Sequence, residues 1–193
     1  VHLAPIQGSA TSSGERPAWY DVMIVLDVSF STRCASGIDV NGDGRLGLNP
    51  RLELLPPGAY PEDACSTDPG DSVLAAEVVG ARRLLQALDP KRVRVGLITF
   101  SGDVDKETGE RLDPNQADAW LQVPLTGEYA EVERALDAVM ARGPHGATNF
   151  SAGLRLGITE LAGMSGARSE PRKGAKAVIL FLIQLGGLGI MTI

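Results

Sequence analysis

The chain has 193 residues, of which 44% are hydrophobic and 22% are charged, and its formal net charge is −6. A chain of this length and composition can bury a core and does not have the composition of a disordered segment. The negative charge argues against a nucleic-acid partner, because phosphate binding depends on clustered Lys and Arg, and an acidic surface with grouped oxygen donors suits divalent cations better.

The composition divides the chain into parts. Residues 1–17 are rich in Gly, Ser, Thr and Pro without periodicity and indicate a leader or linker. The chain starts at Val1 with neither Met nor a signal peptide, which indicates a fragment or a processed product. Residues 18–182 indicate one domain, interrupted by a loop-like insert at 32–70, and residues 183–193 form an atypical hydrophobic tail.

Short apolar runs rich in branched residues predict three strands that are buried on both faces, at residues 20–26, 92–100 and 177–182. Residues 120–125 predict a short edge strand.

Helical spacing of apolar residues fills the intervals between these strands. One predicted helix begins at Asp71 or Ser72 and ends before Pro90, a second covers residues 128–141, and a third begins at Thr148 or Asn149. Alternating strands and helices predict an α/β fold with a doubly wound, mainly parallel sheet. Ligands of such sheets bind beyond the carboxyl ends of the strands, that is, after Leu26, around Thr148 and after Leu182.

The first of these loops carries alternating oxygen donors. Asp27 follows a buried strand directly, where an unpaired carboxylate is costly. The D-x-S-x-S spacing allows a turning loop to direct Asp27, Ser29 and Ser31 at one point, and such hard oxygen ligands suit Mg²⁺. The alternative is that both serines only cap the loop while Asp27 binds backbone amides.

Four motifs in order, MIVLDVSFS, VGLITFS, GATNFSAGL and AVILFL, resemble a von Willebrand factor type A domain over residues 18–182. The resemblance implies a metal-ion-dependent adhesion site in which Asp27, Ser29, Ser31 and Thr148 hold Mg²⁺. An open position on the ion would accept a carboxylate from a protein partner. Phe30 departs from this pattern, because Gly is common there in the family.

The third loop also departs from the family pattern, which has a small residue, Asp and Gly after AVILFL. This chain has Ile183, Gln184 and Leu185 there, so the contribution of this loop is weakened. The family would continue with another helix and strand after Leu182, and we therefore expect a domain truncated at its C-terminus.

The ending LIQLGGLGIMTI resembles a membrane segment of Trk/Ktr-type potassium transporters, which indicates an abnormal junction near Leu182. An alternative takes residues 177–193, which follow several basic residues, as a short membrane span. Membrane association is thus expected only through this tail.

A second group of oxygen donors lies in the insert, where DVNGDG matches the first half of an EF-hand calcium loop. The possible Ca²⁺ ligands are Asp39, Asn41 and Asp43 through their side chains and Arg45 through its carbonyl. Pro50 stands at the twelfth position, where a bidentate Glu is usual. The alternative is an Asx-rich turn without an ion.

Both cysteines, Cys34 and Cys65, fall within the insert. Neither further Cys nor nearby His suggests a metal–thiolate site, so we predict a disulfide and an extracytoplasmic location, with two free thiols as the alternative.

The favoured function is a metal-dependent protein-binding module that is not an enzyme. The alternative is a degenerate or structural domain of the same family with calcium only in its insert. A phosphatase of the haloacid dehalogenase type, with Asp27 as nucleophile, is least favoured, because Ser29 stands where a second Asp is needed.

Overall fold

The computed structural model describes residues 19–48, 66–103, 113, 115–184 and 187–192. Its elements are, in chain order, β1 (Tyr20–Asp27), η1 (Phe30–Arg33), η3 (Pro69–Asp71), α1 (Val73–Ala87), β2 (Val93–Phe100), β3 (Ala119–Thr126), α2 (Tyr129–Arg142), α3 (Phe150–Ala162), β4 (Ala175–Gln184) and β5 (Gly187–Thr192).

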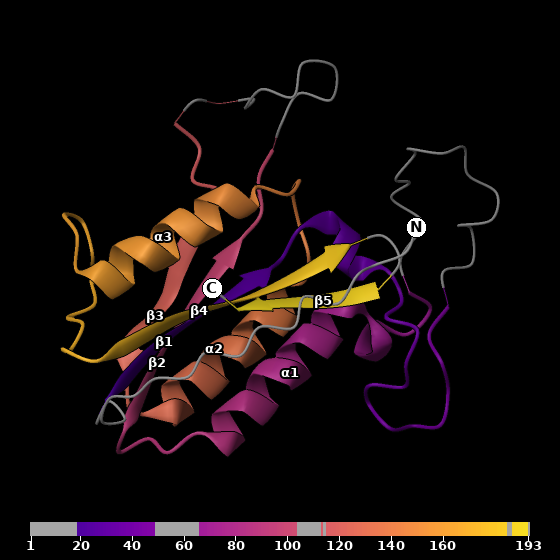
Figure 1. Cartoon of the computed structure of the whole chain (residues 1–193). Helices are drawn as coiled ribbons and strands as arrows, with labels where there is room; N and C mark the ends of the chain where they lie inside the picture. Colours follow the sequence, from indigo (N-terminus) through magenta and orange to yellow (C-terminus); the bar gives the residue numbers. More distant parts are fainter. Residues whose placement is uncertain (1–18, 49–65, 104–112, 114, 185–186, 193) are drawn as a thin grey trace, which may run out of the picture.

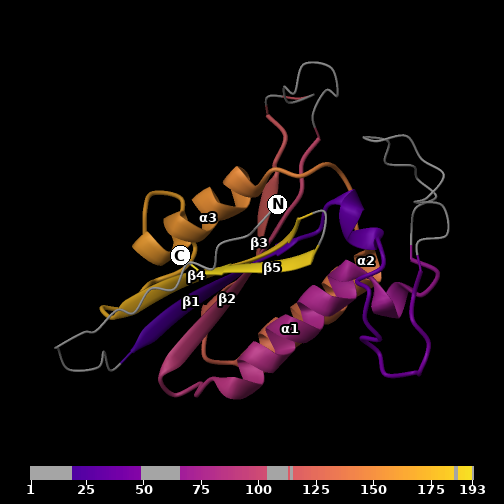
Figure 2. The same cartoon turned by 45° about the vertical axis from the view of Figure 1, so that its right-hand side comes forward.

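One five-stranded sheet has the order β3-β2-β1-β4-β5. β1 runs parallel to both β2 and β4, whereas β3 and β5 are antiparallel edge strands. α1 and α2 cover one face of the sheet and α3 covers the other (Figure 1, Figure 2). The predicted α/β fold with a mainly parallel sheet between helices is therefore confirmed.

The alternation of side chains along β1 divides the core into two layers. Val22, Ile24 and Leu26 pack with residues of α1 and α2, whereas Met23 and Val25 pack with residues of α3. Both layers are apolar because strand side chains point alternately to the two faces, and both faces are covered by helices.

α3 lies close against the sheet through a small residue. A Cβ atom at Gly153 would lie 2.8 Å from the Phe100 ring and 2.9 Å from Val25. Only glycine fits at this contact without displacement of the helix.

The helix starts resolve two ambiguities of the sequence. The Ser72 side chain accepts a hydrogen bond from the Ala75 N–H and caps α1, and the Asn149 side chain accepts one from the Ala152 N–H and caps α3. Thr148, just before the cap, is therefore not needed to begin the helix.

β4 continues beyond the predicted end at Leu182 and forms a hairpin with β5, in which Gln184 is paired with Gly187. The tail after Leu182 thus adds an edge strand to the sheet. No helix in the described part of the chain has both the length and the apolar character needed to cross a membrane.

Candidate metal centre

The candidate centre begins at the carboxyl end of β1, in the first loop (residues 27–33). Asp27 is 1% exposed, and its carboxylate accepts a hydrogen bond from the Ser29 N–H at 2.8 Å. The Oγ atoms of Ser29 and Ser31 lie 3.1 Å apart. The structure thus brings these three donors together. It also shows Asp27 bound to a backbone amide, as the alternative interpretation of this loop expects.

Backbone hydrogen bonds hold the second loop (residues 143–149) against the first. The His145 N–H donates to the Val28 carbonyl at 2.7 Å, and the Phe30 N–H donates to the Gly146 carbonyl at 2.8 Å. Thr148, two residues further on, is exposed. The loop that carries Thr148 therefore lies at the same end of the sheet as Asp27.

Phe30, the residue that departs from the family pattern, supports this contact between the loops. The Arg33 guanidinium stacks on the Phe30 ring at 4.2 Å and donates a hydrogen bond to the Pro144 carbonyl at 3.3 Å. The aromatic ring thus helps to orient a side chain that joins the two loops.

Gly146 is required by the geometry of the second loop. Its φ is +72°, and a Cβ atom there would lie 2.7 Å from the Gly102 carbonyl oxygen. A larger residue would combine backbone strain with a steric clash between the second loop and the end of β2.

Asp118, which the sequence analysis did not single out, fixes the other side of the second loop. This carboxylate is 4% exposed and accepts a hydrogen bond at 2.7 Å from the Asn149 side chain, which caps α3. The Ser101 N–H donates to the Asp118 carbonyl, and the Asn149 N–H donates to the Ser101 carbonyl. The second loop is thus held by the ends of β2 and β3 as well as by the first loop.

The charge of Asp27 has little compensation. Burial raises the pKa of Asp27, and the hydrogen bonds from Ser29 only partly oppose this effect. None of the ion pairs among the described residues includes Asp27. A buried carboxylate of this kind, beside two hydroxyl groups, has the donor chemistry of a Mg²⁺ site.

A second carboxylate, Glu77 of α1, lies near the same end of β1, and the sequence analysis did not single it out. Its side chain is 0% exposed, and neither Oε atom makes a hydrogen bond. Burial raises the pKa of Glu77 well above its ordinary value, the Asp27 charge adds to this, and the nearby Asp27 backbone amide opposes both only in part. The available signal was an acidic residue at helical spacing between Val73 and Ala81.

The third ligand position expected from the family resemblance is occupied differently. Gln184 lies within β4, and its backbone is paired with Gly187 of β5. Leu185, where the family has Gly, lies outside the described residues. The described part of the third loop thus supplies no carboxylate. In the described part of the chain, no group of three or more His, Cys, Asp or Glu side chains is placed to hold a metal ion.

The donors of the insert are bound to their own loop. The Asp39 carboxylate accepts from the Gly42 and Gly44 N–H groups, the Asn41 side chain from the Asp43 N–H, and the Asp43 side chain from the Arg45 N–H. All three donor side chains are exposed. These are Asx turns, which suit both an empty calcium loop and a loop without an ion. Pro50 lies outside the described residues.

Asp71 connects this insert to the start of α1. Its buried carboxylate accepts hydrogen bonds from the Val40, Asn41 and Gly47 N–H groups. Burial acts to raise the pKa of Asp71, but these three amide donors outweigh it and the pKa is lowered. The described part of the insert is therefore held in place by a satisfied carboxylate.

Cys65 lies outside the described residues, so its pairing with Cys34 stays a prediction. The neighbouring positions are joined, because the Ser66 N–H donates to the Arg33 carbonyl at 2.8 Å.

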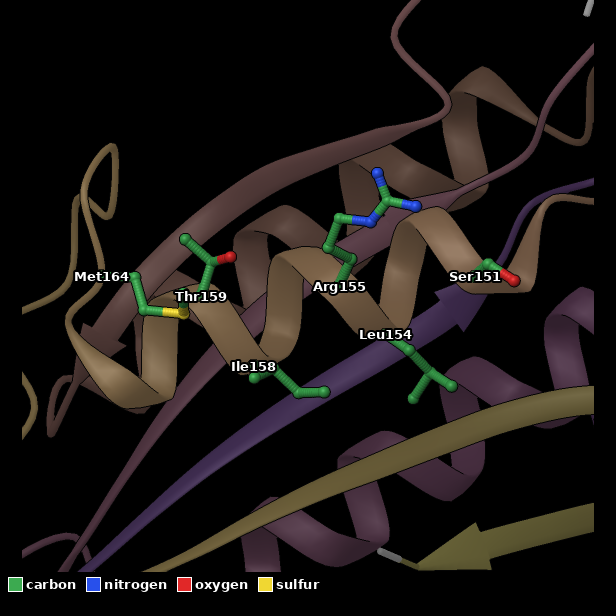
Figure 3. Close-up of a pocket in the computed structure, with 6 residues that line it drawn as sticks. All are labelled: Ser151, Leu154, Arg155, Ile158, Thr159 and Met164. Carbon is green, nitrogen blue, oxygen red and sulfur yellow. The ribbon is translucent and has the colours of Figure 1, made fainter.

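An open groove of about 380 Å³ follows the outer face of α3 (Figure 3). It is lined by Ser151, Leu154, Arg155, Ile158, Thr159 and Met164. Ile158 and Met164 are more than half exposed, at 54% and 55%. None of the described lining residues is one of the expected cation ligands.

No protein-family model and no curated protein sequence matches the chain. Solved structures with a distant likeness include the crystal structure of the conserved hypothetical protein BatB from Bacteroides thetaiotaomicron. It is 15% identical with a TM-score of 0.45, over 89% of this chain and 79% of that chain. Another is an uncharacterized membrane spanning protein from Vibrio fischeri, 14% identical with a TM-score of 0.43, over 89% of this chain and 78% of that chain.

Proposed function

We propose that this chain is a metal-dependent protein-binding module of the von Willebrand factor type A kind. Asp27, Ser29, Ser31 and Thr148 would hold a divalent cation, Mg²⁺ in the first instance. An Asp or Glu of a protein partner would complete its coordination. The observation that carries this proposal is the buried Asp27 carboxylate, which has no ion pair with any described residue and lies beside the loop of Thr148.

Each group of this site has a part in the proposed binding. The Ser29 N–H fixes the Asp27 carboxylate through a 2.8 Å hydrogen bond, and the backbone bonds between the loops hold Thr148 at the same end of the sheet. A bound cation supplies an electron-poor position for an incoming carboxylate. Binding requires no covalent step, which favours a recognition module over an enzyme.

Calorimetric titration of Mg²⁺ and Mn²⁺ into the wild type and Asp27→Asn tests this proposal. We expect cation binding by the wild type and a loss of at least about tenfold in affinity in Asp27→Asn, which keeps the acceptor for Ser29 but removes the charge. Asp89→Asn, an exposed change before β2, is the control and should bind as the wild type does. Equal affinity of Asp27→Asn and the wild type would disprove the proposed site.

A second candidate function is a structural domain with Ca²⁺ in the insert. It is favoured by the Asp39 side chain, which closes over Gly42 and Gly44, both with positive φ. Ca²⁺ should then raise the melting temperature of the wild type and of Asp27→Asn but not of Asp43→Ala. A Ca²⁺ effect that survives in Asp43→Ala would exclude the insert as the binding site.

The extracytoplasmic location belongs to the same proposal and depends on the disulfide between Cys34 and Cys65. Mass spectrometry of the unreduced protein should find these two cysteines in one crosslinked peptide pair after proteolysis. Two separately alkylated peptides would remove this support for the location.

A further inference from the structure

We infer that Glu77 supplies the second carboxylate of the divalent-cation site at Asp27, in place of the acidic ligand that the described third loop lacks. This inference rests on the proposed function and identifies a residue of its site that the family resemblance does not.

The position of Glu77 follows from its helix. Ser72 caps α1, and the helix packs along β1 and against η1 of the first loop. Glu77 lies in the second turn, on the face that is packed against the sheet, and is 0% exposed. Its carboxylate is therefore enclosed between α1 and the end of β1, the strand that ends in Asp27.

Glu77 differs from the other buried carboxylates in its lack of partners. Neither Glu77 oxygen makes a hydrogen bond of normal geometry, although the Asp27 N–H lies near them, and no other described carboxylate has a buried oxygen in this state. Hydrogen-bond donors meet each of the remaining buried acidic side chains, namely Asp21, Asp27, Asp71, Asp118 and Glu160. Buried polar groups in folded proteins are normally paired, so an orphaned carboxylate indicates an absent partner.

The charges of Asp27 and Glu77 at the carboxyl end of β1 indicate which kind of partner the Glu77 carboxylate lacks. Asp27 is the charged group that acts on Glu77, and its effect is repulsive. No described ion pair reaches either residue. Two neighbouring buried carboxylates can be ionised together only when a cation lies with them, and a divalent cation balances both charges.

The side chains at the carboxyl end of β1 are also of the type that binds divalent cations. Two carboxylates and the hydroxyl groups of Ser29 and Ser31 form an all-oxygen donor set, as Mg²⁺ and Mn²⁺ prefer. With Glu77 included, the site has the negative charge that Asp27 alone does not provide.

Two substitutions of Glu77 test the inference by calorimetric titration of Mg²⁺ and Mn²⁺ and by thermal melting. Glu77→Gln removes the charge and keeps the shape, and Glu77→Met places an apolar side chain of similar length in the same buried position. We expect both variants to bind cations about 10- to 100-fold more weakly than the wild type. Without added cation, their melting temperatures should equal or exceed that of the wild type, because an unpaired carboxylate has been removed.

Glu160→Gln is the matched control, because Glu160 is also buried in a helix but accepts hydrogen bonds from the Arg168 and Ser169 N–H groups. This variant should melt at a lower temperature and bind cations as the wild type does.

The outcomes separate the inference from the proposed function. If either folded Glu77 variant binds Mg²⁺ with wild-type affinity while Asp27→Asn does not, the inference is overturned and the proposed site stands. If the wild type binds neither cation, the proposed function and the inference both fall.

Discussion

The two ends of β1 carry buried aspartates with opposite charge balance. Near the amino end, Asp21 is 1% exposed and receives a two-point ion pair from Arg94, with both N···O distances at 3.0 Å. Arg172 adds a backbone hydrogen bond at 2.7 Å and a longer side-chain contact at 3.4 Å. At the carboxyl end, Asp27 is equally buried, but it acts on the nearby carboxylate of Glu77 and has no ion pair with a described Lys or Arg.

This difference distinguishes, on one strand, a carboxylate whose charge is compensated by arginines from one without an ion pair among the described residues. At Asp21, burial acts to raise the pKa, but Arg94 and Arg172 outweigh it and the pKa is lowered. At Asp27, burial prevails and the pKa is raised. The Asp21 carboxylate has its cationic partners within the fold, whereas the proposed function gives Asp27 a cation from solution.

The largest expected effect comes from Asp21→Asn. The substitution leaves Arg94 and Arg172 without their anion, and we expect a loss of about 3 kcal/mol in the free energy of unfolding. Urea denaturation measures this loss. In the absence of cations, Asp27→Asn should not lower the free energy of unfolding, because the substitution removes an uncompensated charge. A similar destabilisation by both substitutions would contradict the contrast between the two ends.

The next effect concerns the loop that completes the Asp27 end. Gly146→Ala should destabilise the protein by about 2 kcal/mol through positive φ and the contact with the Gly102 carbonyl. It should also weaken Mg²⁺ binding, because the loop of Thr148 must shift. Gly143→Ala, also at positive φ but with open space around it, should be strained without weakening the cation affinity. Equal Mg²⁺ affinities of Gly146→Ala and Gly143→Ala would mean that the second loop does not contribute to cation binding.

The two ends should also respond oppositely to pH in the cation-free protein. Raised pKa values of Asp27 and Glu77 mean that the folded state binds more protons than the unfolded state, so stability falls as pH rises above about 4. The lowered pKa of Asp21 contributes stability that is present above about pH 4 and is lost as the pH falls further.

Urea denaturation across pH 2–8 (about six units) separates these contributions. Asp27→Asn and Glu77→Gln should flatten the fall in stability toward high pH, and Asp21→Asn should flatten the fall toward low pH. Saturating Mg²⁺ should abolish the decrease in stability toward high pH in the wild type, but it should have no such effect in Asp27→Asn or Glu77→Gln. A wild-type profile that Mg²⁺ leaves unchanged would speak against cation binding at the Asp27 end.

The smallest expected effect is that of Phe30→Leu. Loss of the ring beneath Arg33 should cost about 0.5–1 kcal/mol, with a slight decrease in Mg²⁺ affinity as the two loops loosen. Chemical denaturation and titration measure both. Increased affinity would instead show that the ring restricts the site.

Local signals in the sequence predicted most of the fold. Branched apolar runs identified the buried strands, and the candidate caps of α1 and α3 included Ser72 and Asn149, the residues that form them. The end of β4 was not predicted, because the family pattern indicated a ligand loop after Leu182. Instead, the backbone continues to Gln184 and pairs with β5 across the edge of the sheet.

The residues of the proposed site were identified from the sequence in part. The D-x-S-x-S spacing placed Asp27, Ser29 and Ser31 together because these residues share one turn, and the family resemblance added Thr148. Glu77 was not singled out, because helical spacing gives no information on whether a hydrogen-bond donor lies near a buried carboxylate.

The sequence by itself determined the order of the elements and the oxygen donors of the first loop, because both depend on residues close together in the chain. Only the tertiary structure decided which buried charges are compensated. Arg94 and Arg172 reach Asp21 from β2 and from the segment before β4, whereas neither Asp27 nor Glu77, whose pKa the Asp27 charge raises, has an ion pair among the described residues. The partners of a buried charge come from distant segments, so its compensation depends on how those segments pack.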